Sequence, residues 1–310
     1  MGTSVEIDPA FGDRLLRQDA SVRPWLDTLP QRVAESCRAW RLRPDGEARF
    51  GGTSLVIPVR TAGDAEAALK LVSPLADAGY ESRALAAFAG HGVVGLLRAD
   101  EDAGALLLER LAPPALAAHG SSPLEAARVA GSVADRLAVV PAPPEAPRLR
   151  DLAEDWLEQL HGQHAEATAV GSAVPEEVFA RAARAVESLA TDDSSMLTHG
   201  DLSLENILRR RDGSWCAIDP VLLRGPVEYE AHTVVRSMLA RLLAVPAPLA
   251  ALRDMHQEFC RAARADAATA WELSLARFVA SAYWESQHGG EVADVGRLWR
   301  TVTLLTPERW

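Results

Sequence analysis

The strongest constraint on the fold of this chain is a change in the pattern of its apolar residues at Pro113-Pro114. Short strand-like runs occur before this point, and long helical patterns follow it. The chain before this point predicts helices over roughly its first 40 residues and a helix over 80–88, stopped by Gly90. Short apolar runs separated by turn residues predict four β-strands in the same region: 54–59, 67–72, 93–98 and 105–111.

After Pro114 the pattern becomes mainly helical. Ser122-Pro123 is a typical helix start, and the proline-rich loop 141–147 ends that helix. A short β-hairpin is predicted within 207–218. Further helices are predicted at 152–167, 176–190, 229–243, 249–265 and 270–284. We therefore predict an α+β chain with a strand-rich part over 1–111 and a helix-rich part over 112–310.

Charge and cysteine usage narrow the class of protein. A formal net charge of −11 disfavours binding to nucleic acid and suits a polycationic ligand, although it equally serves solubility. Three scattered cysteines (Cys37, Cys216 and Cys260) form no C-x-x-C pair, which favours a reducing cytoplasm over a disulfide framework. No apolar run is long enough to predict a membrane span.

The most informative motif is His199-Gly200-Asp201 followed by Asn206, with Ile218-Asp219-Pro220 downstream. An H-x-D-x-x-x-x-N loop and a later aspartate after an apolar strand are the chemical core of kinase-type phosphoryl transfer. Asn206 and Asp219 would hold Mg²⁺ against the phosphates of ATP, and Asp201 would accept the proton of an acceptor hydroxyl. His199 is better interpreted as a residue that braces the loop. The alternative for Asp201 and Asn206 is ordinary turn chemistry.

Hairpin geometry gives this interpretation a structural test. Asp212-Gly213 is a favoured centre for a two-residue turn, and pairing about it would put Asn206 directly opposite Asp219. Directly opposed side chains have Cβ atoms about 5 Å apart, close enough for their oxygens to share one cation. A longer loop would shift this register.

Lys70 is the single lysine among 32 basic residues. It ends an apolar run, and a compact ammonium is not interchangeable with a guanidinium at a phosphate site. Glu81 shares a helical stripe with Leu85 and Phe88, so its carboxylate needs a partner, and Lys70 is the natural one. Two alternatives stay open. The single lysine could have been retained by chance, and Glu81 could lie at the periphery and pair with an arginine in solvent.

Two further segments are candidates for nucleotide binding. Gly51-Gly52 could cover phosphates with backbone N–H groups, or could simply form a turn before a strand. The run 105–111 suits a strand leading into a hinge, where backbone groups around Glu109 and Leu111 would meet adenine.

With these motifs in view, the chain resembles the aminoglycoside and hydroxyurea antibiotic resistance kinases, particularly the streptomycin 6-phosphotransferases. The resemblance spans most of residues 22–240 and includes W-L-D-T-L-P at 25–30, W-R-L-R-P-D-G at 40–46 and A-I-D-P at 217–220. It implies a protein-kinase-like two-lobed fold, with a nucleotide-binding lobe over 1–111 and a lobe carrying the catalytic loop and acceptor site over 112–310. It also implies Mg·ATP as donor and a hydroxyl of an aminocyclitol antibiotic as acceptor.

The chain departs from the family pattern at two places near the expected acceptor site. Ser203 stands where the family often has a second histidine, and Gly225 to Glu230 replaces a G-D-x-x-Y-D-like segment. A guanidinium-bearing acceptor such as streptomycin would need carboxylates and aromatic faces. The expected acceptor contacts, each of which could instead be an ordinary helix or core residue, are Glu228, Glu230, Glu272, Trp284 and Glu285.

These features predict an enzyme: a cytoplasmic, ATP- and Mg²⁺-dependent kinase of a small, polycationic acceptor such as streptomycin, with no role for nucleic acid or membrane. Two alternatives stay open. One is a kinase of another hydroxylated metabolite, such as an amino sugar, a nucleoside or a biosynthetic intermediate. The other is a catalytically inactive ligand-binding pseudokinase, although the complete set of Lys70, Glu81, Asp201, Asn206 and Asp219 argues against it.

Overall fold

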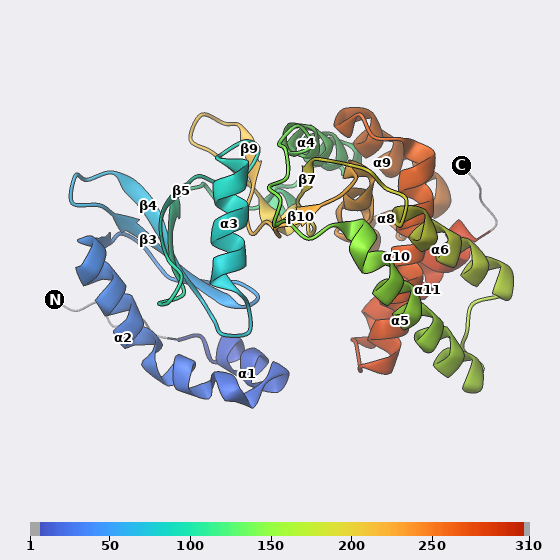
Figure 1. The fold of residues 1–310 in the computed structure, drawn as a ribbon, viewed down its shortest axis with the longest axis horizontal. Coiled ribbons are helices and arrows are strands. Elements are labelled where there is room, and N and C mark those ends of the chain that lie inside the picture. The colour runs from blue at the N-terminus through green and yellow to red at the C-terminus, as the bar shows by residue number, and fades with distance from the viewer. Residues whose placement is uncertain (1–6, 307–310) are drawn as a thin grey trace. The chain divides into compact units, whose positions relative to one another are not determined.

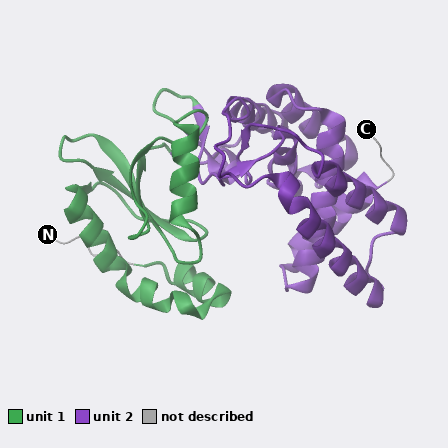
Figure 2. Ribbon diagram, viewed as in Figure 1, with its two compact units in different colours: residues 1–112, 210–214 green, residues 113–209, 215–310 purple. Residues whose placement is uncertain are grey.

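The computed structural model describes residues 7–306 and divides the chain into two compact units. The first unit comprises residues 1–112 and 210–214, and the second comprises 113–209 and 215–310 (Figure 2). The main boundary lies beside Pro113-Pro114, where the sequence pattern changes.

The first unit begins with helices and continues with the strands of one sheet, which a further helix interrupts between β4 and β5. Its elements are α1 (Pro9–Gln18), η1 (Ala20–Val22), α2 (Arg23–Trp40), β1 (Arg43–Pro44), β2 (Arg49–Phe50), β3 (Ser54–Arg60), β4 (Glu66–Val72), α3 (Ala78–Phe88), β5 (Leu96–Asp100) and β6 (Ala105–Glu109).

The sheet of the first unit is antiparallel and six-stranded, in the order β1-β3-β4-β6-β5, with β2 also paired to β3. Helices flank it, with α1 and α2 away from α3 (Figure 1). Successive side chains of a strand point to opposite faces. Leu69 and Leu71 of β4 therefore join the core that contains Phe11 and Trp25, whereas Lys70 between them points to the other face and meets Glu81 of α3.

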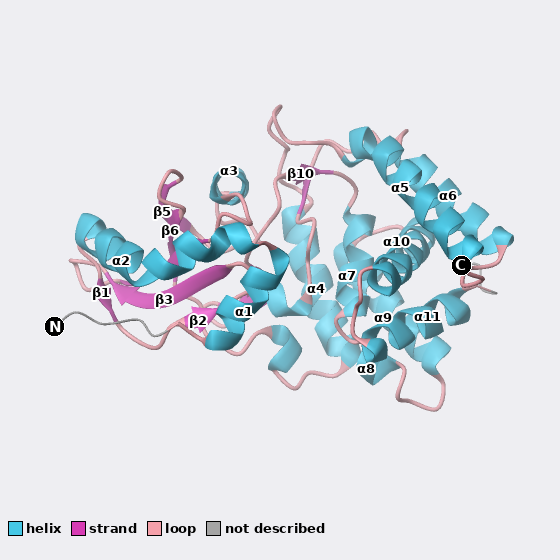
Figure 3. Ribbon diagram, turned by 90° about the horizontal axis from the view of Figure 1, so that it is seen from below, coloured by secondary structure: helices cyan, strands magenta, loops and turns pink. Residues whose placement is uncertain are grey.

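The second unit is mainly helical, as Figure 3 shows by colour. Its elements are η2 (Leu116–Ala118), α4 (Pro123–Leu137), α5 (Leu149–Ala169), α6 (Glu176–Leu189), β7 (Leu197–Thr198), η3 (Leu204–Asn206), β8 (Ile207–Arg209), β9 (Trp215–Ala217), β10 (Leu223–Arg224), η4 (Val227–Glu230), α7 (Ala231–Arg236), α8 (Leu239–Leu242), α9 (Pro248–Ala263), α10 (Ala267–Gln287) and α11 (Val292–Leu305).

Two local features of α4 fix where this helix begins and how closely it packs. The Ser122 side chain and Glu125 form a reciprocal capping box at the start of α4, with Pro123 at its first position. Helices α4 and α9 approach so closely that a Cβ added to Gly131 would lie 2.5 Å from the carbonyl oxygen of Phe259.

Within residues 7–306, no helix is both long and apolar enough to cross a membrane.

Three predictions about elements need correction. The helix predicted over 229–243 is divided into η4, α7 and α8, because the backbone leaves the helical region at Met238 (φ −115°, ψ 7°) and the Ser237 hydroxyl bonds back to the Thr233 carbonyl. The strand predicted from residue 93 begins only at Leu96. The sequence did not predict helix α11 or the four two-residue strands β1, β2, β7 and β10. Strands this short have no detectable period.

Candidate active site

The loop 199–206 connects β7 to η3 and β8 in the second unit. Strand β7 pairs with β10, which anchors the start of the loop. Gly200 has φ +84°, and a Cβ at this position would lie 2.9 Å from the Cβ of Val221. Glycine is therefore required here, because another residue would have both a strained backbone and a steric clash.

The carboxylate of Glu230 holds this loop in place. Its Oε1 accepts a hydrogen bond from the backbone N–H of Gly200 at 2.6 Å and another from the Thr198 hydroxyl, and its Oε2 accepts one from the N–H of Leu202 at 3.1 Å. Glu230 is 1% exposed. The expectation that Glu230 contacts the acceptor is wrong, because its oxygens are buried and used within the loop.

His199 braces the loop, as predicted. It is fully buried, its Nε2 lies 3.0 Å from the carbonyl oxygen of Ile218, and the backbone N–H of Asp201 donates to its Nδ1 at 3.3 Å. This pattern assigns the proton of a neutral imidazole to Nε2. His199 thus links the loop to the strand that leads to Asp219.

Asp201 and Asn206 are brought together by the loop. The Nδ2 of Asn206 donates to the backbone carbonyl of Asp201 at 2.9 Å and to its carboxylate Oδ2 at 3.3 Å. Because Nδ2 is used in this way, the amide oxygen of Asn206 is the free end, and it has no hydrogen-bond partner within residues 7–306. Asp201 itself is exposed.

The predicted register of the β8–β9 hairpin is wrong by one residue. Ile207 pairs with Ala217, and the N–H of Ile218 donates to the carbonyl of Asn206 at 2.8 Å, so Asn206 lies opposite Ile218 and not opposite Asp219. The loop contains three residues, with Gly213 at φ +85°, in place of the two residues assumed. Asp219 follows directly and has φ +58°, so regular strand alternation does not extend to its side chain.

The donor set of these residues fits a magnesium ion. Asn206 supplies an amide oxygen and Asp219 a half-buried carboxylate, both hard oxygen ligands of the kind that Mg²⁺ prefers. A left-handed backbone in a residue other than glycine is uncommon and concentrates at functional positions. Within the described residues, this site included, no cluster of three or more His, Cys, Asp or Glu side chains could hold a metal ion. Two protein ligands suit a cation that takes its other ligands from phosphates and water.

In the first unit, Lys70 and Glu81 form the predicted ion pair. The Nζ of Lys70 lies 2.7 Å from both carboxylate oxygens of Glu81, and the two side chains are 4% and 12% exposed. Asp77 caps α3 by accepting hydrogen bonds from the N–H groups of Gly79 and Tyr80, which fixes the helix turn that carries Glu81. Contact of Lys70 with phosphate stays a prediction.

The glycine pair lies in the turn between β2 and β3. Both Gly51 and Gly52 are exposed, and the Gly51 carbonyl accepts a hydrogen bond from the Arg14 guanidinium of α1. Neither glycine has a positive φ, and a Cβ on Gly52 would meet open space. A phosphate-binding role for this turn stays a prediction.

Glu109 ends β6, and Leu111 lies two residues further along the chain. The backbone N–H of Glu109 donates to the carbonyl of Gly95 at 2.8 Å, so this N–H is not free for adenine. Its carboxylate accepts a hydrogen bond from the Gly95 N–H and pairs with Arg210 at 3.0 Å. Adenine binding by backbone groups near Leu111 stays a prediction.

A cavity of about 410 Å³ opens beside Asp201 in the second unit. Its lining includes Ser203 and Glu205 from the loop, together with the imidazole of His232 and the hydroxyl of Thr233 from α7. The presence of two arginines in this lining was not predicted: Arg236 of α7 and Arg277 of α10.

None of the four other predicted acceptor residues lines this cavity. Glu228 accepts a hydrogen bond from the N–H of Asp266, and Glu272 pairs with Arg181 at 2.7 Å beside a different cavity. Trp284 is 47% exposed and stacks on His288, whereas Glu285 pairs with Arg236 at 3.0 Å. Glu285 thus reaches the cavity wall only through this arginine.

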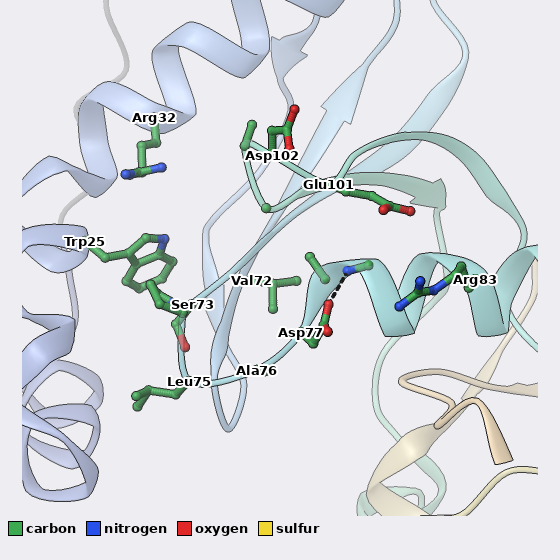
Figure 4. A pocket seen from close by; sticks show the side chains of 15 residues that line it. Trp25, Arg32, Val72, Ser73, Leu75, Ala76, Asp77, Arg83, Glu101 and Asp102 are labelled. Atoms are coloured by element: carbon green, nitrogen blue, oxygen red, sulfur yellow. Dashed lines mark hydrogen bonds between the residues drawn. The ribbon is translucent and has the colours of Figure 1, made fainter. Parts of the chain in front are cut away.

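A larger cavity of about 710 Å³ lies in the first unit, and none of the predicted site residues lines it (Figure 4). Trp25 and Arg32 come from α2, Asp77 from the start of α3, and Glu101 and Asp102 from the β5–β6 turn. This mixture of both charges and an indole does not define one ligand chemistry.

Comparison with known proteins identifies the family of the chain. The family model for aminoglycoside/hydroxyurea antibiotic resistance kinases matches residues 39–289. The streptomycin 6-kinase of Streptomyces griseus is 31% identical over 270 residues, which are 86% of each chain. The hydroxyurea phosphotransferase of Kitasatospora aureofaciens is 36% identical over 236 residues, which are 74% of this chain and 68% of that one.

Solved structures support the same fold at low identity. A choline kinase from Streptococcus pneumoniae has a TM-score of 0.58 at 13% identity, covering 90% of this chain and 99% of that one. An amicoumacin kinase in complex with AMP-PNP and Ca²⁺ has a TM-score of 0.55 at 12% identity, covering 86% and 88%. The fold is protein-kinase-like, and the chain belongs to the aminoglycoside/hydroxyurea antibiotic resistance kinases.

Proposed function

We propose that this enzyme transfers the γ-phosphoryl group of ATP to a hydroxyl of a small molecule, with Mg²⁺ as the metal. The observation that carries the proposal is the loop held by Glu230, in which Asn206 is hydrogen-bonded to Asp201 and Asp201 lines a cavity. The amicoumacin kinase of similar fold is in complex with an ATP analogue and a divalent cation, which supports this donor.

Each residue has a distinct part in the proposed reaction. Mg²⁺, held by Asn206 and Asp219, would neutralise charge on the phosphates. Asp201 would orient the acceptor hydroxyl and accept its proton as the new O–P bond forms and the bond to ADP breaks. Lys70, kept in place by Glu81, would bind the α- and β-phosphates.

Streptomycin and related aminocyclitols are the first acceptors to test, because two streptomycin 6-kinases are 31% and 28% identical to this chain. A net charge of −11 also suits a polycation. A cytoplasmic location belongs to the proposal and is supported by three free cysteines: Cys37, Cys216 and Cys260.

A different small hydroxylated acceptor is the second candidate. The presence of Arg236 and Arg277 in the cavity beside Asp201, and the absence of the expected carboxylates from its lining, favour this candidate. The 36% identity to a hydroxyurea phosphotransferase also widens the range of acceptors to test.

The deciding experiment is ADP release by the purified chain with Mg·ATP and a panel of streptomycin, other aminoglycosides, hydroxyurea and hydroxylated metabolites. Turnover should fall by about 10²- to 10⁴-fold in Asp201→Asn, the magnitude typical of a lost general base. Asp193→Asn, a change at an exposed aspartate shortly before the loop, should leave the rate unchanged. Binding of Mg·ATP without turnover of any acceptor would instead indicate an inactive ligand-binding protein.

A further inference from the structure

The cavity beside Asp201 contains a guanidinium that is fixed in position but not neutralised. The Cζ of Arg277 lies 4.0 Å from the ring centroid of Tyr229, and its Nη1 donates to the Tyr229 carbonyl at 2.7 Å. No carboxylate of residues 7–306 pairs with Arg277. A stacked arginine held by one carbonyl keeps its full charge and most of its five N–H donors.

The second arginine of the cavity differs in this respect. The Nη2 of Arg236 donates to the carboxylate of Glu285 at 3.0 Å, and its Nη1 donates to the Ser281 hydroxyl at 3.2 Å. The charge of Arg236 is therefore compensated within the protein. The uncompensated positive charge of the cavity wall belongs to Arg277.

The cavity wall next to these arginines is polar but not negative. His232 is 2% exposed, and burial, followed by the charges of Arg277 and Arg236, holds its pKa well below the usual range, so the imidazole is neutral. Thr233 is 8% exposed. Its Oγ1 and the Nδ1 of His232 have no hydrogen-bond partner in the described part of the chain. The carboxylates in the lining are Asp201, which faces the hydroxyl in the proposed reaction, and the exposed Glu205.

We propose that Arg277 binds a carboxylate of the acceptor, so that the substrate is a small hydroxy acid with its hydroxyl at Asp201 and its carboxylate at Arg277. This inference rests on the phosphotransferase activity proposed above and names its acceptor class. A planar guanidinium matches a carboxylate through two parallel hydrogen bonds. A guanidinium-bearing polycation would place like charge against Arg277.

The transferred phosphoryl group is the competing anion for Arg277. The experiment separates binding of the acceptor carboxylate from binding of this phosphoryl group. Acceptors that differ only in charge serve as probes. One triplet is D-gluconate, D-sorbitol and D-glucamine, and a shorter one is D-glycerate, glycerol and 3-amino-1,2-propanediol. ADP release with Mg·ATP gives kcat and KM for each, with streptomycin and hydroxyurea measured alongside.

We expect the carboxylate member of a triplet to be the best substrate. Arg277→Gln should lower its kcat/KM by about 10- to 100-fold, mostly through KM, as for the loss of a charged hydrogen-bonded pair. The same variant should leave the neutral and amine members within about twofold, because they make no such pair. Arg277→Lys should recover part of the loss, and Arg184→Gln, at an exposed arginine of α6, is the matched control.

Three outcomes would overturn the inference. One is no turnover of any carboxylate member, whatever happens with streptomycin or hydroxyurea. Another is a neutral or cationic member as the better substrate. The third is an equal loss of kcat for all acceptors in Arg277→Gln, which would assign Arg277 to the phosphoryl group. Failure of the proposed function is distinguishable, since the chain would then release no ADP with any acceptor, streptomycin and hydroxyurea included, whether or not it binds Mg·ATP in a thermal-shift titration.

Discussion

The carboxylate of Glu230 accepts the backbone N–H of Gly200 at a distance of 2.6 Å, across thirty residues of sequence. The same carboxylate accepts the N–H of Leu202, so two amides on either side of Asp201 are fixed by one buried side chain. Asp201 is itself exposed. The rigidity of the loop therefore comes from a residue that does not face the cavity.

Glu230→Gln should weaken this loop while keeping its shape. The amide of glutamine has one oxygen in place of two, so one of the backbone N–H groups would face an N–H₂ group. We expect a loss of about 1–3 kcal/mol in the free energy of unfolding, as for an unsatisfied buried group. We also expect kcat to fall by about tenfold or more with little change in KM for ATP, because a displaced base acts on the transition state. Steady-state kinetics and urea unfolding measure both effects.

Glu228→Gln is the control for this prediction. Glu228 accepts a single backbone N–H, that of Asp266 at the start of α10. The one amide oxygen of glutamine can still accept this N–H, so the change should cost about 1 kcal/mol of stability or less and should not alter kcat. Equal effects of the two variants on kcat would argue against a special role of Glu230 in the loop.

Local sequence signals predicted the parts of the site that are close together in the chain. The H-x-D-x-x-x-x-N motif assigned Asp201 and Asn206 to one site, and the structure shows them hydrogen-bonded to each other. The Lys70–Glu81 pair, predicted from the end of an apolar run and the helical stripe of Glu81, is confirmed. The hairpin was also predicted, but its register depended on loop length. Asp212-Gly213 fits a two-residue and a three-residue loop equally well, and the structure has the latter.

The remaining parts of the site depend on packing between distant segments. Glu230 was predicted to contact the acceptor, and only its burial against the loop shows that it binds backbone amides instead. Arg277 lies in the middle of α10 with no motif around it, and its position beside Asp201 depends on how α10 packs on η4 and α7. A periodic pattern indicates that a helix face is buried and does not indicate which cavity it lines.

Breaking the Lys70–Glu81 pair should destabilise the first unit strongly. Lys70→Met leaves the Glu81 carboxylate without its ammonium partner in a site where the two side chains are 12% and 4% exposed. We expect a loss of about 3–5 kcal/mol, the magnitude found when one partner of a buried pair is removed. Urea unfolding followed by tryptophan fluorescence measures it, and ADP release should be abolished.

The double variant Lys70→Met with Glu81→Leu tests the cause. Because it removes both charges, it should recover part of the lost stability but none of the activity. A double variant as unstable as Lys70→Met alone would show that lost packing, and not the broken ion pair, dominates.

Two buried serines of the first unit should respond differently to alanine. Ser73 is 1% exposed, and its hydroxyl has no hydrogen-bond partner among the residues that the structure describes. Ser82 is 4% exposed and donates to the Glu101 carboxylate. Ser73→Ala should be neutral or slightly stabilising, whereas Ser82→Ala should cost about 1–2 kcal/mol, because only the latter removes a bond to a charged acceptor.

Thermal unfolding of the two variants under identical conditions makes the comparison. A clear loss of stability in Ser73→Ala would mean that its hydroxyl is satisfied in solution, with water in the adjoining cavity as the available partner.

The helical unit should lose stability on mild acidification. Burial lowers the pKa of His256 from 6.5 to about 4, and burial likewise holds the pKa of His232 well below its usual range. The unfolded chain therefore binds a proton at each site near pH 6.5, whereas the folded chain does so only at lower pH. The contribution of His256 to stability is complete above about pH 6.5 and is lost toward pH 4, by about 1.4 kcal/mol per pH unit, and His232 acts with the same sign.

Urea unfolding monitored by circular dichroism between about pH 7 and pH 5 measures this slope. His256→Gln cannot take up the proton, so its stability should decrease over this interval by about 2 kcal/mol less than that of the wild type. His232→Gln should show a reduction of the same sign, and the two reductions should add, because the sites titrate separately. A His256→Gln variant with the full wild-type slope would show that other groups cause the acid sensitivity. Carboxylates such as Glu258 would then be the source, because hydrogen bonds from Arg261 and Arg128 lower its pKa to about 2.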